Sequence, residues 1–269
     1  MRHLPPALAA LVLALAALPA QAHDTWLHRA ERQPGSGLLV LEMGTGGRYP
    51  KSEGAVPGNR VAGSECVDET GRRSGLVPRA EHEAWLELRA RMGDARVAAC
   101  SLELLAVDLA LTNELVDLYM VDVRAPQAVR DAAAAQRKAG VEWKEVYRKY
   151  IRIEVPVQPG ATATSYADLR KPRGLPLELV PAGNEPLATG KPAEFVALSN
   201  GKPVPNLAVE FVPSRGPIGL WRQTDAQGRI GLTLPFGGEW LLRATTFEIP
   251  QNAQEPWRTR FGTLTVEVR

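Results

Sequence analysis

Residues 193–212 read AEFVALSNGKPVPNLAVEFV, and this stretch is the strongest indicator of the fold class. Two short apolar runs, Ala193–Leu198 and Leu207–Val212, lie on either side of Asn200-Gly201. Asn-Gly favours a tight turn between strands, because both residues readily adopt a positive φ. The stretch therefore predicts two short β-strands separated by turn residues.

The same pattern continues to the C-terminus. Strands spaced about 8–12 residues apart are typical of an immunoglobulin-like β-sandwich, which we expect over residues 187–269. Residues 182–191 are rich in turn formers and predict a linker in front of it. The further expected strands are the apolar segments 218–221, 230–234, 239–245 and 263–268.

Upstream of the linker, residues 23–181 predict an N-terminal β-rich domain with short helical inserts, so the chain is expected to be mainly β. Two stretches rich in Ala, Leu, Glu and Arg, 113–123 and 127–139, predict the helices. Pro126 suits a helix start and Gly140 a helix end. The expected strands are the apolar or alternating runs at 38–43, 60–67, 85–90, 96–105 and 151–157.

Residues 142–150 read EWKEVYRKY and predict a third short helix. On a helix, Trp143, Val146, Tyr147 and Tyr150 would share one face. An aromatic stripe at this spacing usually packs against a core, so we expect no ligand role for it.

The chain has two cysteines, Cys66 and Cys100, with no second cysteine at a metal-ligand spacing such as C-x-x-C. In an oxidising compartment an isolated pair is most simply a disulfide. We predict a Cys66–Cys100 bond with Cα atoms about 4.4–6.8 Å apart. A thiolate metal site is the alternative.

Residues 1–22 have the character of a secretory signal peptide. Arg2 is followed by an apolar run over residues 7–18 and by Ala20-Gln21-Ala22, the small-x-small pattern that precedes cleavage. The apolar run is shorter than the roughly 20 residues that span a bilayer, and no later stretch reaches that length. We expect a periplasmic protein, cleaved after Ala22, with no membrane span after signal removal.

Cleavage after Ala22 would make His23 the first residue. An N-terminal histidine offers a free α-amine and an imidazole, which together can chelate a transition metal near neutral pH. Cleavage two residues earlier would place this histidine third from the amine, which also suits square-planar Cu(II) or Ni(II). Tight binding needs further ligands, and we expect His82 and Asp24 to supply them. His28 is expected to be an ordinary polar side chain.

Net charge and the absence of known catalytic motifs exclude several classes of function. A net charge of +2 offers no electrostatic basis for binding nucleic acid. The chain contains no Gly-x-Ser-x-Gly elbow, His-Glu-x-x-His motif or P-loop, so we do not expect an enzyme.

Eight segments follow one another along the chain: HDTWL (23–27), GRYPKSE (47–53), WKEVYRKY (143–150), GLPLELVP (174–181), GKP (201–203), TDAQGR (224–229), GEWLLRA (238–244) and FGTLTV (261–266). In this order they resemble the domain-of-unknown-function 4198 family, bacterial periplasmic proteins often described as components of nickel or cobalt uptake systems. The resemblance implies two linked β-rich domains and a role near transition-metal handling.

The sequence is compatible with three candidate functions. The first is a periplasmic transition-metal-binding accessory protein that takes Ni or Co, with Cu as an alternative, and that meets a membrane transporter or another envelope protein. The second is a non-enzymatic envelope module that binds a protein partner through its sandwich domain. The third is a copper enzyme with His23 as a ligand, and metal titration and oxidase assays distinguish the three.

Overall fold

The protein is mainly β with two short helices. The computed structural model describes residues 23–269 except 36, 159 and 217–218. The expected signal peptide, residues 1–22, lies outside the described residues.

Three sheets contain all the named strands. The large sheet has the order β15 (Leu220–Gln223), β14 (Ala208–Pro213), β17 (Gly238–Glu248), β18 (Trp257–Val268), β10 (Trp143–Pro156), β8 (Val97–Leu104), β4 (Val61–Asp68) and β5 (Arg73–Gly75), with β9 (Val107–Leu111) beside β10. The second sheet has the order β1 (Asp24–Arg29), β2 (Leu38–Gly46), β7 (Trp85–Arg91) and β6 (Val77–Glu81), with β3 (Gly54–Ala55) beside β2. The third contains β11 (Glu178–Pro181), β12 (Pro192–Ser199), β13 (Lys202–Pro203) and β16 (Arg229–Thr233).

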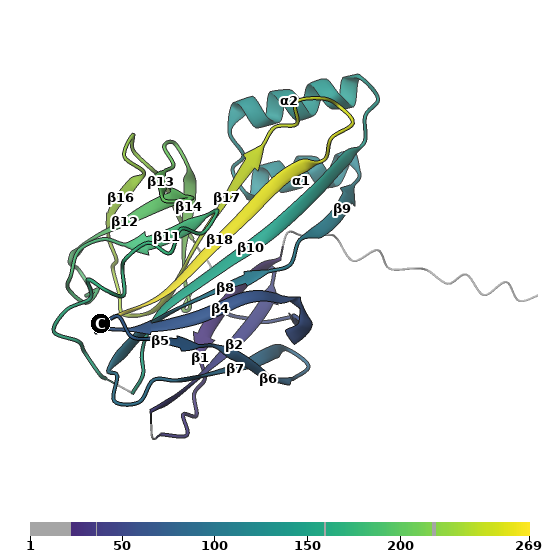
Figure 1. Cartoon of the computed structure of the whole chain (residues 1–269). Helices are drawn as coiled ribbons and strands as arrows, with labels where there is room; N and C mark the ends of the chain where they lie inside the picture. Colours follow the sequence, from purple (N-terminus) through teal and green to yellow (C-terminus); the bar gives the residue numbers. More distant parts are fainter. Residues whose placement is uncertain (1–22, 36, 159, 217–218) are drawn as a thin grey trace, which may run out of the picture.

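The two smaller sheets cover opposite faces of the large one. Alternate residues of a strand point to opposite faces. Ile151 and Ile153 of β10 belong to the core shared with the β1–β2–β7 sheet. Their neighbour Tyr150 belongs to a second core, which the large sheet shares with the β11–β12–β16 sheet. This core also contains Phe195 of β12 and Phe211 of β14. The second arrangement is a β-sandwich, so the predicted fold class is confirmed (Figure 1).

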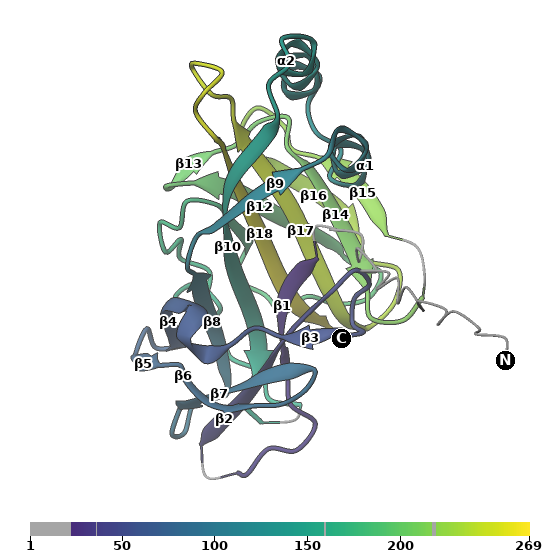
Figure 2. The ribbon, with the colours of Figure 1, turned by 90° about the vertical axis from the view of Figure 1, so that its right-hand side faces the viewer.

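Both predicted helices are present, as α1 (Asn113–Asp122) and α2 (Gln127–Lys138). The Thr112 side chain accepts a hydrogen bond from the Leu115 amide and so caps α1. The helices lie at one end of the long strands β10 and β18, away from β2 and β7 (Figure 2). They enclose a third core in which the rings of Trp143 and Trp257 stack with centroids 4.4 Å apart.

The predicted helix over 142–150 is wrong, because this segment is the first part of β10. Trp143 and Glu145 are buried while Lys144 between them is exposed, which is the alternation of a strand. The segment pairs with β9 on one side and β18 on the other. Hydrogen bonding to both neighbouring strands and burial of one face stabilise the strand more than the helical spacing of the aromatic residues would stabilise a helix.

The two predicted domains share sheets across their expected boundary. β10 and β18 pair in parallel from Glu145–Trp257 to Glu154–Val266, and β11 pairs with β12. The expected linker, 182–191, is held in place: Leu187 is buried and the Thr189 amide donates to the Arg269 carbonyl at 2.6 Å. Independent folding of residues 23–181 and 187–269 stays a prediction.

The Cys66–Cys100 disulfide is present and buried. The two residues lie directly opposite each other on the antiparallel strands β4 and β8. Their Cα atoms are 3.9 Å apart, which is less than the separation we expected.

Neither helix in the described part of the chain has the length and apolar run needed to cross a membrane.

Candidate functional site

His23 lies directly before β1 and contacts an acidic side chain. Its Nε2 is 3.1 Å from Oε2 of Glu53, and the two side chains are 41% and 45% exposed. The Glu53 amide donates to the Thr45 carbonyl at 2.8 Å, which fixes Glu53 beside the end of β2. An imidazole that donates from Nε2 to a carboxylate keeps Nδ1 as its basic nitrogen, and this orientation is common among metal-binding histidines.

Asp24 points into a partly buried ionic cluster around Arg243. Its Oδ2 lies 2.8 Å from Nη1 of Arg243, whose Nε lies 2.5 Å from Oε2 of Glu210. Asp122 completes the cluster at 3.3 Å from Arg243. Burial raises the pKa of Asp24, while Arg243 and Lys149 oppose that rise. The carboxylate expected to bind a metal therefore has an arginine partner.

His82 lies in the turn between β6 and β7, beside other partners. Its ring stacks on Trp85 with centroids 5.1 Å apart, and its Nε2 is 3.9 Å from Oε2 of Glu87. His28 contacts Glu42 on the β1–β2–β7 sheet, at 3.2 Å from Nε2 to Oε2. Burial lowers the pKa of His28.

The structure does not gather the three expected ligands, His23, Asp24 and His82, into one group. Within residues 23–269, apart from the four positions left undescribed, no three His, Cys, Asp or Glu side chains are arranged to hold a metal ion. Any metal bound at His23 would therefore need donors beyond these side chains.

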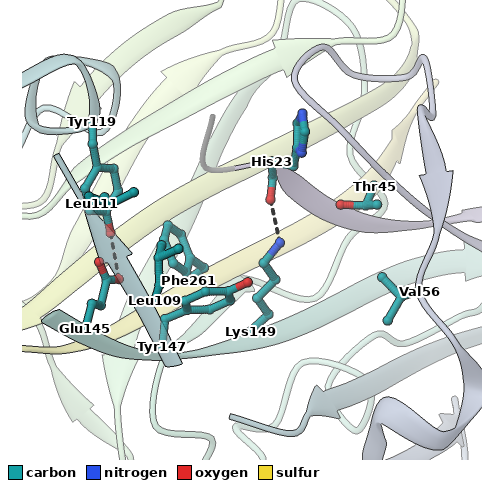
Figure 3. Close-up of a pocket in the computed structure, with 10 residues that line it drawn as sticks. All are labelled: His23, Thr45, Val56, Leu109, Leu111, Tyr119, Glu145, Tyr147, Lys149 and Phe261. Carbon is teal, nitrogen blue, oxygen red and sulfur yellow. Dashed lines mark hydrogen bonds between the residues drawn. The ribbon is translucent and has the colours of Figure 1, made fainter. Parts of the chain in front are cut away.

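A pocket of about 310 Å³ lies beside His23. Its floor is the face of β10 that carries Glu145, Tyr147 and Lys149, which alternate along the strand. Phe261 of β18 lies opposite Lys149 in the ladder. Figure 3 shows the remaining lining residues, which are His23, Thr45, Val56, Leu109, Leu111 and Tyr119.

Lys149 connects the pocket to the start of β1. Its Nζ donates to the His23 carbonyl at 2.5 Å and to the Thr25 hydroxyl at 3.0 Å. Figure 3 shows the His23 carbonyl, rather than its ring, turned toward this amine. Burial lowers the pKa of Lys149 to about 8, although nearby Asp24 opposes the change. Lys149 therefore fixes the position of His23 through the main chain.

Glu145 is buried at another part of the pocket, with neutral hydrogen-bond donors. The indole Nε1 of Trp143 donates to Oε2 at 3.0 Å, and the Tyr119 hydroxyl donates to Oε1 at 3.2 Å. Burial raises the pKa of Glu145, and these hydrogen bonds oppose the rise.

Glu145, Tyr147 and Lys149 were not predicted as site residues. A helix over 142–150 would place Trp143 on the same face as Val146, whereas the strand places it on the same face as Glu145. Glu53 lies in the family-like segment GRYPKSE, and its contact with His23 was not predicted. Residues 143–150 do not alternate strictly between apolar and polar, and the clear alternation begins only in the predicted strand 151–157, which continues the same strand.

The fold and the pocket define a class: a mainly β protein in which two smaller sheets cover a shared large sheet, with a pocket beside the first strand. The family model described as Domain of unknown function (DUF4198) matches residues 20–248. The chain belongs to this family.

The comparisons with curated proteins and with solved structures identify no function. No curated protein matches the chain. A solved structure titled "Crystal structure of tetra-tandem repeat in extending region of large adhesion protein" is 10% identical, and the match covers 91% of this chain and 49% of that chain. The chain thus spans about half the length of that protein, and a TM-score of 0.23 supports no inference about function.

Proposed function

We propose that the protein is a periplasmic transition-metal-binding accessory protein of a nickel- or cobalt-type uptake system, with His23 as its metal ligand. The observation that carries the proposal is the 3.1 Å contact between His23 Nε2 and Glu53. With Nε2 held by Glu53, Nδ1 and the α-amine created by cleavage after Ala22 would form one chelate ring. Imidazole and amine nitrogens suit Ni(II), Co(II) and Cu(II).

The ligand set fits transfer of an ion better than its storage. His23 would supply two nitrogen donors and Glu53 would orient the ring. Asp24 has Arg243 as its partner and His82 lies beside Glu87, so neither is placed to complete the site. Water or groups from a membrane transporter would occupy the remaining positions, and an ion with few protein ligands can be passed on.

Periplasmic export is part of the proposal. The buried Cys66–Cys100 disulfide is consistent with an oxidising compartment. Signal cleavage after Ala22 concerns residues outside the described part of the chain, so mass analysis of the exported N-terminus is the first measurement.

The main test is calorimetric titration of the processed protein with Ni(II), Co(II), Cu(II) and Zn(II). We expect His23→Ala to weaken binding at least about 100-fold, because it removes the imidazole and with it the chelate ring. Glu53→Gln should weaken it about tenfold, as loss of a partner of a metal-binding histidine does. Affinity should fall with decreasing pH, since protons compete for both nitrogens.

His82→Ala is the matched control, because His82 is also a partly exposed histidine beside a glutamate. It should bind metal as the unchanged protein does. Equal affinity in the processed protein and His23→Ala would refute the metal proposal and favour an envelope module that binds a protein partner. Reductant-dependent oxidase activity of the copper-loaded protein would instead favour the copper enzyme.

A further inference from the structure

The buried carboxylate of Glu145 has no cationic partner in the described part of the chain. It is 2% exposed and appears in no ion pair among those residues. Its oxygens accept hydrogen bonds from the neutral groups of Trp143 and Tyr119, and the neutral Thr259 hydroxyl also lies beside them. A buried carboxylate is costly without a positive charge beside it.

Lys149 does not fill that role. It is four residues further along β10, which places its Cα roughly 13 Å from that of Glu145. Its amine donates to the His23 carbonyl and the Thr25 hydroxyl. Its amine lies 5.8 Å from the centroid of the Tyr147 ring and 6.0 Å from that of the Phe261 ring, so this end of the pocket already holds a cation, whereas no cation pairs with Glu145 in the described part of the chain.

Aromatic rings surround the space beside Glu145. The Tyr119 and Phe261 rings have centroids 6.2 Å apart, and Tyr147 packs perpendicular to Phe261 at 5.6 Å. All three side chains line the same pocket as Glu145. The faces of aromatic rings carry partial negative charge and attract cations, especially where water is excluded.

We propose that this part of the pocket binds a small organic ammonium ion, with its charge beside Glu145 and its apolar groups against Tyr119, Tyr147 and Phe261. A bare metal ion fits less well, since a metal needs several donors and Glu145 is the one carboxylate in the pocket lining. A volume of about 310 Å³ is at the small end for ligand pockets and suits a compact amine.

Paired ligands that differ only in charge provide the test. We would titrate choline, and separately its neutral isostere 3,3-dimethylbutan-1-ol, into metal-free protein by calorimetry. Choline should bind at least about tenfold more tightly, because only its charge is attracted to the rings and the carboxylate. Equal affinity of the two compounds, or no binding of choline at millimolar concentration, would overturn the proposal.

Variants locate the binding. Glu145→Gln should weaken choline binding at least about tenfold, and Phe261→Leu should weaken it severalfold. Glu142→Gln is the control, because it removes the same charge three residues away on an exposed side chain outside this pocket. Unchanged choline affinity in folded Glu145→Gln protein would place the ligand elsewhere and refute the assignment.

This inference is independent of metal binding. Nickel is titrated into Glu145→Gln protein, which should bind the ion as the unchanged protein does, because Glu145 contacts neither His23 nor Glu53. Loss of nickel binding in folded Glu145→Gln protein would show that the two sites are one, contrary to the proposal. Failure of the metal titration alone would leave the ammonium site intact.

Discussion

Lys149 is the residue that most directly couples the pocket to the N-terminal strand. Its amine is buried, yet it holds the His23 carbonyl and the Thr25 hydroxyl. A charged ammonium group in this position loses hydration that these two oxygens only partly replace. Burial accordingly favours its neutral form and holds its pKa near 8.

The titration of Lys149 predicts how stability depends on pH. Between the folded pKa of about 8 and the ordinary value of 10.5, the unfolded chain binds more protons than the folded protein. The free energy of unfolding should therefore rise with pH, by roughly 2 kcal/mol from about pH 7.5 to 9.5. Urea unfolding of the unchanged protein and of Lys149→Met measures this contribution as a difference.

The exposed Lys144, on the same strand, is the control for that experiment. Lys144→Met should keep the pH dependence of the unchanged protein, whereas Lys149→Met should lose it. If both variants show the same pH dependence as the unchanged protein, Lys149 does not titrate in this range and the prediction is wrong.

β10 is the element that organises the molecule. One face carries the pocket residues and then Ile151 and Ile153, and the other face carries Arg152, which forms a buried ion pair with Glu178 of β11. Glu178 also accepts from the Arg173 amide at 2.9 Å. This pair joins the large sheet to the third sheet.

Breaking the buried pair should cost far more than breaking an exposed one on the same strand. Glu178→Gln leaves the Arg152 charge buried without its carboxylate, and we expect a loss of about 3–5 kcal/mol in the free energy of unfolding. Glu103→Gln removes the partner of the half-exposed Arg148 and should cost less than about 1 kcal/mol. Similar losses in chemical denaturation would show that burial does not govern these pairs.

At the scale of the element, the sequence predicted most strands and both helices. The turn at Asn200-Gly201 is confirmed, since both residues adopt positive φ, 49° and 77°. The segment 142–150 was misread because its aromatic residues fit a helical period and its strand pairs come from distant parts of the chain. The local sequence pattern cannot reveal pairing with β18, because β18 lies more than 100 residues later in the chain.

The whole molecule is joined by the large sheet, which contains strands from both predicted domains. We expect one cooperative unfolding transition, because separating the two cores would break the parallel ladder between β10 and β18. Near-ultraviolet circular dichroism and tryptophan fluorescence should give the same midpoint in urea. Two separate midpoints would contradict this expectation and support independent folding of residues 187–269.

The sequence alone was enough to predict a mainly β chain, two helices and the Cys66–Cys100 pair, because alternation, helix-forming composition and cysteine count are local or compositional properties. The tertiary structure decided the rest. In it, Glu53 contacts His23, whereas Asp24 pairs with Arg243 and His82 lies beside Glu87. Glu145 and Phe261 line the same pocket. These neighbours come from strands far apart in the chain, and their proximity depends on sheet register and on which face each residue occupies.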